Sequence, residues 1–536
     1  MELDASIDQA KWAMQDGRDV PWLLARQASE RGDHPFLIWE PFTGEARTWT
    51  YADFRAQVRR VAASLNTRGV EVGDRVMIHL DNSPEFLLSW FACAELGAVA
   101  VSTNTRSVAR DMEYFADKAH VVAAITSPGF ARLVADTADD LRFLVVTADD
   151  AGETPSSAAR AELEQLSHVP FTDLLATEAE PPTRATDPTA ELGIQFTSGT
   201  TSRPKAVLWT HANATWGAET SASHLRLRPD DVTLVMLPMF HTNAQSWSML
   251  TTLWSGGTMV LQPRFSASRF WDVALRHDVS WVSMIPFCVR ALIPHDVPAE
   301  HRMRFWGIGA RVPEFEERFG VLTLGWWGMT ETITQGIVDS VDLPGPRRTI
   351  GRASPGYDVS VRDPDGRPVR PGERGRLFVR GVRGVSMFLR YDGDPEADAA
   401  AFDDDGWFDT GDMIGTDADG NLFFSDRAKD MLKVGAENVA ASEVETVVMQ
   451  TGLAVEVAVV GQPHAMLDEV PVAFLITTDP TLDHTEIERR VIDHCAANLA
   501  DFKVPRAVHV LDELPRSTIE KIAKNVLREG LPTLDG

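Results

Sequence analysis

One short segment combines hydroxyl side chains, a glycine and a lysine in a way that suits a phosphate group. Residues 196–205 read Phe-Thr-Ser-Gly-Thr-Thr-Ser-Arg-Pro-Lys. Hydroxyls, backbone N–H groups and an ammonium group all donate to phosphate oxygens. The residue order is not that of the GxxxxGK[ST] loop. On these residues alone two interpretations stay open: a phosphate-binding loop, or a surface turn rich in serine and threonine.

Other side chains could do chemistry beside a phosphate, although each also has an ordinary structural interpretation. Thr330 and Glu331 could contact an anion and ligate a metal, or they could simply begin a helix. His241 follows the apolar run LPMF, where core histidines are common, and Lys521 lies in EKIAKNVLRE, typical of a solvated helix. Asp412 could accept hydrogen bonds from a diol, or it could occupy a turn.

Alternating strand-like and helix-like segments must position these residues. Between residues 73 and 126 the pattern predicts three strands and two helices, and this alternation indicates a parallel sheet covered by helices. The strands are expected at Arg75–Leu80, Ala98–Val101 and Val121–Ile125, and the helices at Ser83–Leu96 and Val108–Lys118. Strands are also expected on both sides of the hydroxyl-rich loop, at Gly193–Phe196 and Ala206–Trp209.

Further along the chain the pattern changes twice. A second strand–helix series runs from 231 to about 338, and short strands with Gly, Pro and Asp turns fill 349–425, which predicts an antiparallel, barrel-like subdomain. After Arg427 a unit of about 105 residues has the size and pattern of a compact α+β domain. Its expected elements are helices at Glu443–Gln450 and Glu486–Leu499 and strands at Val455–Val460, Val470–Ile476 and Ala507–Leu511.

Composition excludes several classes of protein. The chain has 536 residues, 44% hydrophobic and 24% charged, as globular proteins do, and its net charge of −27 argues against broad binding to nucleic acid or anionic membrane. Cys93, Cys288 and Cys495 form no CxxC pair, so a disulfide framework is not expected. We see no signal peptide and no long apolar run, and therefore expect a cytoplasmic protein without a membrane span.

The hydroxyl-rich segment TSGTTSRPKAV resembles the phosphate-binding signature of the adenylate-forming superfamily, which includes acyl-CoA synthetases, peptide-synthetase adenylation domains and firefly-type luciferases. Other motifs of that superfamily follow in the same order, and the wording SGTTSRPK and GMTET is similar to crotonobetaine/carnitine–CoA ligase-like members. The matching segments are Gly73–Pro84 with Glu95–Val101, Leu237–His241, Gly328–Glu331, Trp407–Asp412, Asp426–Glu445 and Leu514–Lys521.

The resemblance implies roles for individual residues. Lys521, Thr330, Glu331 and His241 would be catalytic, with Glu331 as the Mg²⁺ ligand and His241 beside the carboxylate. The ATP- and AMP-binding residues would be Thr197, Ser198, Gly199, Thr200, Thr201, Lys205, Trp327, Gly328, Met329, Asp412 and Arg427. The hinge would be Asp430, and Gly435, Ala436 and Glu437 would line the CoA tunnel. The acyl pocket would be lined by His241, Asn243, Gln245, Trp247, Trp326, Thr332 and Gln335.

The implied fold is α/β: a large N-terminal domain of parallel α/β sheets with a small β-barrel-like subdomain (1–429), then a small mobile α+β C-terminal domain (430–536). The implied reaction activates a carboxylic acid with ATP and Mg²⁺ to acyl-AMP, releasing pyrophosphate, and then transfers the acyl group to coenzyme A. The acid could belong to natural-product biosynthesis, and a homodimer is expected because relatives often form one.

Three departures from the motifs leave alternatives open. The hinge-following loop reads Gly-Ala-Glu-Asn at Gly435–Asn438 instead of GGEN, Glu520 replaces the glycine before the lysine, and the segment Gly307–Pro313 is shortened. One alternative is therefore an adenylating enzyme that hands acyl-AMP to a carrier protein or partner enzyme. A second, of another class, is a catalytically impaired protein that binds nucleotide or acyl-adenylate. A luciferase-like oxygenase is a more distant third.

Overall fold

The computed structural model describes residues 12–197, 204–427, 431–434, 437–464, 467–499, 501–516 and 522–534. Contacts divide the chain into two compact units, one formed by Met1–Val359 with Val379–Phe408 and the other by Ser360–Phe378 with Asp409–Gly536. This division groups residues by packing. The predicted boundary at residues 429 and 430 concerns a hinge, which packing does not address, and it stays a prediction.

The first unit contains an eight-stranded sheet with the order β19-β9-β8-β4-β3-β5-β6-β7. Its strands are β3 (Arg75–His79), β4 (Val99–Ser102), β5 (Val121–Thr126), β6 (Phe143–Val146), β7 (Val169–Pro170), β8 (Glu191–Thr197), β9 (Lys205–Thr210) and β19 (Arg390–Tyr391). The strands from β8 to β7 pair in parallel. Strand β4 is buried along its whole length, as expected for a parallel strand covered on both faces.

A second sheet of the same unit has nine strands, in the order β16-β15-β14-β13-β12-β10-β11-β1-β2. Its strands are β1 (Pro35–Trp39), β2 (Arg47–Thr50), β10 (Val232–Val235), β11 (Thr258–Leu261), β12 (Trp281–Ser283), β13 (Phe305–Ile308), β14 (Leu322–Trp327), β15 (Ile337–Val338) and β16 (Arg352–Ala353). The strands from β14 to β1 pair in parallel, and the chain leaves β14 directly into the residues of the candidate site.

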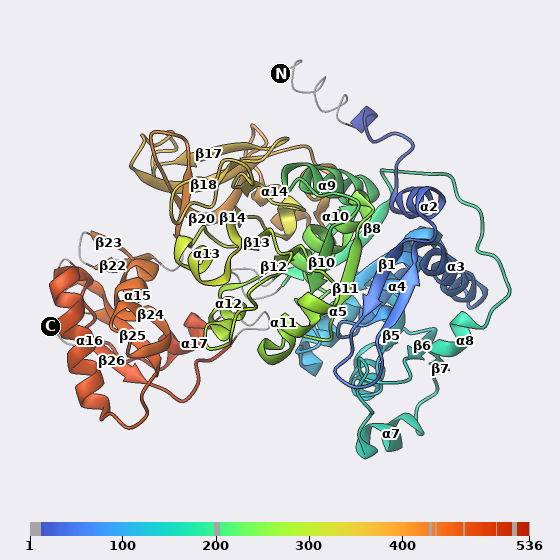
Figure 1. The fold of residues 1–536 in the computed structure, drawn as a ribbon, viewed down its shortest axis with the longest axis horizontal. Helices are drawn as coiled ribbons and strands as arrows, with labels where there is room; N and C mark the ends of the chain where they lie inside the picture. The colour runs from blue at the N-terminus through green and yellow to red at the C-terminus, as the bar shows by residue number, and fades with distance from the viewer. Residues whose placement is uncertain are drawn as a thin grey trace. The chain divides into compact units, whose positions relative to one another are not determined.

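Helices surround these sheets, and α9 and α10 lie side by side (Figure 1). The predicted helix at Ser83–Leu96 is confirmed as α4, because Ser83 caps it by accepting from the N–H of Phe86 and Gly97 ends it at a φ of 75°. The helices of this unit are α2 (Val20–Glu30), α3 (Tyr51–Thr67), α4 (Pro84–Leu96), α5 (Ala109–Ala119), α6 (Ala131–Thr137), α7 (Ser157–Leu163), α8 (Phe171–Leu175), α9 (His211–His224), η1 (Asn243–Leu250), α10 (Thr251–Ser255), α11 (Ala267–Arg276), α12 (Pro286–Leu292), α13 (Pro313–Phe319), η2 (Thr330–Thr332) and α14 (Pro395–Ala401).

The segment predicted as one barrel-like subdomain, 349–425, is distributed among three sheets. Strand β16 joins the nine-stranded sheet and β19 joins the eight-stranded one, while the rest forms a four-stranded sheet. That sheet has the order β17-β18-β20-β21, formed by β17 (Asp358–Arg362), β18 (Arg374–Arg380), β20 (Phe408–Thr416) and β21 (Leu422–Arg427). The residue pattern of a short segment can indicate a β-strand, but it does not indicate which other strand that segment pairs with.

The second unit also holds the α+β fold expected after Arg427. Its five-stranded sheet has the order β23-β22-β25-β24, with β26 beside β25. The elements are β22 (Met431–Val434), β23 (Glu437–Ala440), β24 (Ala454–His464), β25 (Asp468–Thr477), β26 (Ala507–Val510), α15 (Ala441–Gln450), α16 (His484–Asn498), η4 (Asp501–Lys503) and α17 (Lys524–Glu529). One apolar cluster joins α15 and α16 to this sheet.

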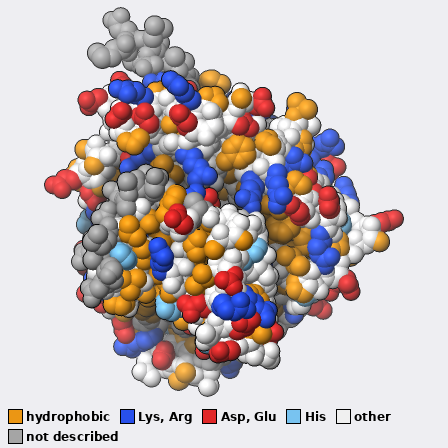
Figure 2. Space-filling model, turned by 90° about the vertical axis from the view of Figure 1, so that its left-hand side faces the viewer, with side chains coloured by type: hydrophobic (Ala, Val, Ile, Leu, Met, Phe, Trp, Pro, Cys, Tyr) orange, Lys and Arg blue, Asp and Glu red, His pale blue; other side chains and the backbone are white. Residues whose placement is uncertain are grey.

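Two further features concern the surface and the length of the helices. On the face drawn in Figure 2, acidic and basic side chains are interspersed. Within the described ranges, the helices are too short or too polar to be candidates for crossing a bilayer.

Candidate active site

The short helix η2, which follows β14, is held in place from several directions. The carbonyl groups of residues 330–333 each accept a hydrogen bond from a different part of the first unit. The donors are the Trp209 indole to Thr330 at 3.0 Å, the Phe388 backbone N–H to Glu331 at 2.9 Å, the Tyr357 hydroxyl to Thr332, and the Trp247 indole to Ile333 at 3.1 Å. Such external donors fix a polar turn before any ligand arrives, which is the arrangement that electrostatic catalysis requires.

A strained turn directly follows η2. Ile333 has φ 62° and ψ −56°, and the N–H of Thr334 donates to the carbonyl of Thr332, which closes a γ-turn. This conformation is rare and is unfavourable for a β-branched residue, and such strain is concentrated at functional sites. The Ile333 side chain lies against α9, where a Cβ on Gly217 would be 3.0 Å from Cγ2 of Ile333.

Glu331 is 4% exposed, and its carboxylate accepts a hydrogen bond from the Tyr391 hydroxyl at 2.9 Å. The ammonium group of Lys205 lies 4.4 Å from the centre of the Tyr391 ring, within cation–π range. Thr197 and Lys205 face each other in the β8–β9 pair, so they are the two ends of the predicted phosphate loop. Tyr391 therefore joins the predicted metal-binding carboxylate to the predicted phosphate-binding lysine.

The pKa of Tyr391 is raised strongly. Burial is the largest cause, followed by the negative charge and hydrogen bond of Glu331. The phenol therefore stays protonated over the physiological range and remains a donor to the carboxylate.

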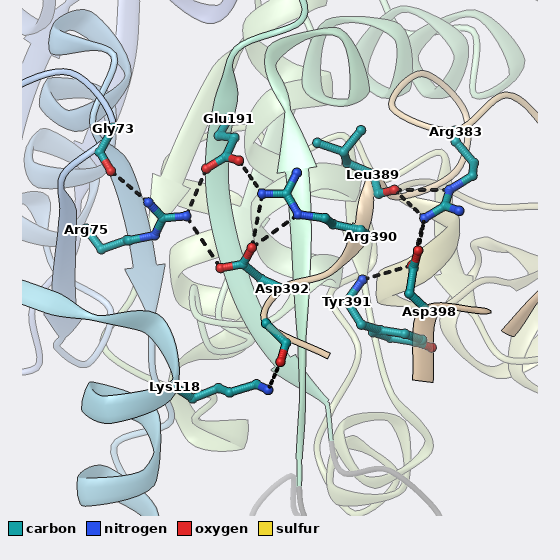
Figure 3. Close-up of polar contacts among 11 residues, drawn as sticks. Gly73, Arg75, Lys118, Glu191, Arg383, Leu389, Arg390, Tyr391, Asp392 and Asp398 are labelled. Atoms are coloured by element: carbon teal, nitrogen blue, oxygen red, sulfur yellow. Dashed lines mark hydrogen bonds and ion pairs between the residues drawn. The ribbon is translucent and has the colours of Figure 1, made fainter. Parts of the chain in front are cut away.

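An ion-pair network holds the strand that carries Tyr391 (Figure 3). Arg390 pairs with Glu191 and with Asp392, the latter at 3.1 Å. Arg75 pairs with the same two carboxylates at 3.0 and 3.5 Å. Arg75 is on β3, Glu191 on β8 and Arg390 on β19, and Asp392 directly follows β19, so these pairs connect the end of β19 to β8 and β3.

Two of the predicted acyl-pocket residues are tryptophans that fill space between η1 and β14. The rings of Trp247 and Trp326 meet edge to face with centroids 5.6 Å apart, and they are 7% and 4% exposed. Glycines leave room for both rings, because a Cβ on Gly307 would overlap Trp326 and a Cβ on Gly328 would be 2.7 Å from Trp247. The two rings pack in one apolar cluster with Leu225, Trp281 and Phe305.

The other residues predicted to line the acyl pocket are buried or half-buried, and most of their polar atoms are hydrogen-bonded within the protein. Asn243 accepts from Ser283 at 2.6 Å, Thr332 is fully buried, and Gln245 is 1% exposed with both ends of its amide paired. The Gln335 Oε1 accepts from Ser221 at 3.0 Å and lies 3.1 Å from His224, while within the described ranges its Nε2 has no protein partner. His241 is half-buried, and its ring packs edge to face on Phe240.

The residues predicted to bind the nucleotide are divided between the two units, and each group is described within its own unit. In the first, the Trp327 ring packs over Gly336, where a Cβ would be 3.2 Å away, and Gly328 and Met329 connect it to η2. In the second, Asp412 is 6% exposed and lies opposite Arg427 in the β20–β21 pair. This register places two of the residues predicted to bind ATP or AMP on adjacent strands.

Several predicted residues lie outside the described residues. They are Ser198, Gly199, Thr200 and Thr201 of the phosphate loop, the hinge Asp430, Gly435 and Ala436 of the CoA tunnel, and the catalytic Lys521. The backbone of Glu437 belongs to β23, and its side chain is not described.

Sequence reasoning missed the aromatic donors around η2. Tyr357 and Tyr391 are two of only four tyrosines in the chain, and both donate to η2. Their scarcity was an available signal, but their contacts are long-range and cannot be derived from local pattern: Tyr391 reaches Glu331 through the pairing of β19 with β9, and Tyr357 lies 25 residues from Thr332.

Comparisons with known proteins agree over almost the whole chain. Residues 24–391 match the family of AMP-binding enzymes, and residues 443–521 match the AMP-binding enzyme C-terminal domain. A crotonobetaine/carnitine–CoA ligase of Salmonella paratyphi C is 34% identical over 527 residues, which cover 96% of this chain and 99% of that protein.

Solved structures are similar over the same length. ATP-bound MatB from Rhodopseudomonas palustris has a TM-score of 0.80 at 29% identity, covering 95% of this chain and 98% of that one. The o-succinylbenzoate CoA synthetase of Bacillus subtilis, in complex with its acyl-adenylate intermediate, has a TM-score of 0.79 at 26% identity, covering 94% and 97%. The two family matches and the relative that is 34% identical over nearly the full length show that this chain belongs to the AMP-binding enzyme family and hence to the adenylate-forming superfamily.

Proposed function

We propose that this protein is an AMP-forming acid–CoA ligase, which activates a small carboxylic acid as acyl-AMP and transfers the acyl group to coenzyme A. The observation that carries the proposal is the Glu331–Tyr391–Lys205 arrangement. In it, one tyrosine contacts both a buried carboxylate and a cation at the end of a hydroxyl-rich loop. The similarity to CoA ligases over nearly the full length supports the same reaction.

The chemistry requires charge neutralisation, because a carboxylate must attack the α-phosphate of ATP and both groups are anionic. In our proposal Thr197 and Lys205, with the loop between them, hold the outer phosphates, and Thr330 donates to the α-phosphate. Asp412 accepts from the ribose hydroxyls, Trp327 packs on adenine, and His241 lies beside the incoming carboxylate. Lys521 completes the adenylation site from the C-terminal domain.

Glu331 is suited to hold Mg²⁺. Its carboxylate is buried and oriented by Tyr391, and Mg²⁺ prefers oxygen ligands, most of which phosphates and water would supply. Within the described ranges no group of three or more His, Cys, Asp or Glu could hold a metal, so one carboxylate with phosphate oxygens is the arrangement we propose. When bound, the ion would neutralise phosphate charge.

The second half-reaction is assigned to rotation of a domain about Asp430, which would present the Gly435–Glu437 segment to the pantetheine arm of coenzyme A. We propose the domain boundary at residues 429 and 430 for this reason. The finer possibilities are that a carrier protein or partner enzyme accepts the acyl group, that the enzyme is a cytoplasmic homodimer, and that its acid belongs to a natural-product pathway.

The test is to incubate the protein with ATP, Mg²⁺ and pooled carboxylic acids, with and without coenzyme A, and to identify products by mass. Acyl-AMP without coenzyme A that becomes acyl-CoA with it is the expected result. Acyl-AMP that persists in the presence of coenzyme A would indicate that a carrier, and not coenzyme A, accepts the acyl group. Formation of neither product, while AMP still binds, would support the catalytically impaired alternative.

Two variants connect the products to this site. Lys521→Ala is expected to abolish adenylation while leaving AMP binding nearly unchanged. Glu331→Gln keeps the shape of the side chain but removes its charge, and is expected to reduce adenylation at least a hundredfold. Glu316→Gln is the control, because Glu316, on α13, is a carboxylate that pairs with Arg311 at 3.0 Å and is not among the predicted site residues.

A further inference from the structure

A chain of buried side chains leads from the interior to the hydroxyl of Thr330. The Gln245 Nε2 lies 2.9 Å from the carbonyl oxygen of Met239 and 3.0 Å from Ser102. The Gln195 Nε2 lies 2.9 Å from the Gln245 Oε1. The Thr242 hydroxyl lies 2.6 Å from the Gln195 Oε1 and 3.0 Å from the Thr330 hydroxyl. Apart from the half-buried Thr330, each of these groups is at most 6% exposed.

The direction of donation along most of this chain is fixed by chemistry. A carbonyl oxygen only accepts, so the atom of Gln245 that faces Met239 must be its nitrogen. The other end of that amide is then an oxygen, which must receive an N–H from Gln195. This in turn orients the Gln195 oxygen toward Thr242, whose hydroxyl is placed to donate to it at 2.6 Å.

Thr242 therefore stands between two acceptors with one proton. When Thr242 donates to Gln195, its contact with Thr330 is a hydrogen bond only if Thr330 is the donor, and that bond holds the Thr330 proton away from a phosphate. When Thr242 turns its proton to Thr330, the Thr330 proton is released to donate outward. In the second arrangement Thr242 donates to Thr330 and Thr330 donates to the anion. Consecutive hydrogen bonds of this kind polarise and strengthen one another.

We propose that Thr242 is a positioning residue that sets the direction of the Thr330 hydroxyl, and that Gln195 competes for the Thr242 proton. This rests on the proposed function, in which Thr330 donates to the phosphate attached to adenosine. Thr242 follows His241 and precedes η1, whose Gln245 anchors the chain. The hydrogen bond between Thr242 and Thr330 therefore connects the segment that includes His241, which we propose lies beside the incoming carboxylate, to the residue that donates to the nucleotide phosphate.

The two neighbours must then have opposite effects. Thr242→Val keeps the shape of the side chain but cannot donate, so affinity for AMP is expected to fall about three- to tenfold, the range of a single hydrogen bond. Gln195→Met removes the competing acceptor and is expected to raise affinity for AMP. A purely structural role would weaken binding in both variants.

The experiment is isothermal titration of the full-length protein with AMP and with adenosine, for the wild type, Thr242→Val, Thr242→Ser and Gln195→Met. Adenosine lacks the phosphate, so its dissociation constant is expected to change less than twofold in every variant. Thr242→Ser keeps the hydroxyl donor, so its dissociation constant for AMP is expected to match that of the wild type. Thermal unfolding of each variant shows that the protein is folded.

Each contrary outcome is decisive. The proposal is overturned if Thr242→Val leaves AMP affinity unchanged, if AMP and adenosine weaken together, or if Gln195→Met weakens AMP as Thr242→Val does. If Gln195→Met does not fold, the comparison of Thr242→Val with Thr242→Ser still decides. If the wild-type protein binds AMP no more tightly than adenosine, the proposed role of Thr330 is refuted instead, and the proposed function with it.

Discussion

At the scale of single residues, Tyr391 has two separable roles. Its hydroxyl donates to Glu331, and the face of its ring attracts the ammonium group of Lys205. Removing the hydroxyl leaves the ring in place, whereas removing the ring loses both contacts. Two substitutions at one position can therefore separate orientation of the carboxylate from placement of the lysine.

Tyr391→Phe is expected to raise the Mg²⁺ concentration that gives half-maximal adenylation about three- to tenfold, because a carboxylate without its hydrogen bond is less well oriented. Tyr391→Leu should add a loss of affinity for ATP, since the cation–π contact with Lys205 is also lost. Mg²⁺ and ATP titrations of ATP–pyrophosphate exchange measure both effects.

Tyr51→Phe is the matched control for Tyr391→Phe. Tyr51 is fully buried and donates to the Gly257 carbonyl at 2.7 Å, so its substitution also removes one buried hydrogen bond. It should lower stability without changing the Mg²⁺ requirement. If Tyr391→Phe and Tyr51→Phe behave alike in the Mg²⁺ titration, Tyr391 does not orient the carboxylate.

At the scale of elements, α9 keeps a glycine where alanine would favour the helix. A glycine inside a helix costs about 1 kcal/mol relative to alanine, so Gly217 requires a packing reason. The reason is the strained turn at Ile333, whose Cγ2 would lie 3.0 Å from an added Cβ. Helix α9 thus gives up intrinsic stability to accommodate the turn that follows η2.

Gly217→Ala is expected to lower the adenylation rate about tenfold or more, because a shift of a few tenths of an ångström at Ile333 is passed to Thr330 and Glu331. The unfolding temperature should change little, since the gain in helix propensity offsets the crowding. Steady-state kinetics and calorimetry on the same preparation measure the two effects.

A second substitution tests the physical cause of that rate loss. Ile333→Ala removes the methyl group that the new Cβ would meet, so the double variant should recover part of the activity lost in Gly217→Ala. Strictly additive losses would show that Gly217 and Ile333 act independently.

Elements with strong local patterns were predictable, and their partners were not. The strand over β3 and the helix α4 follow from a buried apolar run and from Ser83 and Pro84 at the helix start. Strand β19 is only Arg390–Tyr391, and nothing local predicts that it extends the eight-stranded sheet beside β9. Because that pairing brings Tyr391 to Glu331, the role of Tyr391 at the candidate site could not be predicted from the sequence either.

At the scale of the whole molecule, the resemblance to a superfamily gave the architecture and the order of site motifs, while the hydrogen bonds that tune the site had to come from the structure. Gln245 illustrates the difference. Its position beside His241 suggested a pocket-lining amide, yet both ends of the amide are paired inside the chain that leads to Thr330. Sequence position located the residue, and packing determined its partners.

Three buried histidines make the first unit sensitive to acid. Burial lowers the pKa of His79 and of His224 to about 4 and that of His211 to about 3, from an ordinary value of 6.5. Between these values the unfolded chain binds protons that the folded chain does not. Stability is therefore fully present above pH 6.5 and is lost as the pH falls, by about 2 kcal/mol for each histidine between pH 7 and 5.

Calorimetry of the wild type at pH 7, 6 and 5 should show the unfolding temperature of the first unit falling steadily. His211→Asn cannot titrate and retains an acceptor for the Val20 N–H, which Nδ1 of His211 now accepts at 3.3 Å, so its decline should be shallower. His120→Asn is the control, because His120 is exposed at a φ of 51°, which asparagine tolerates. Equal slopes for the wild type and His211→Asn would mean that other groups, chiefly carboxylates, determine the acid sensitivity.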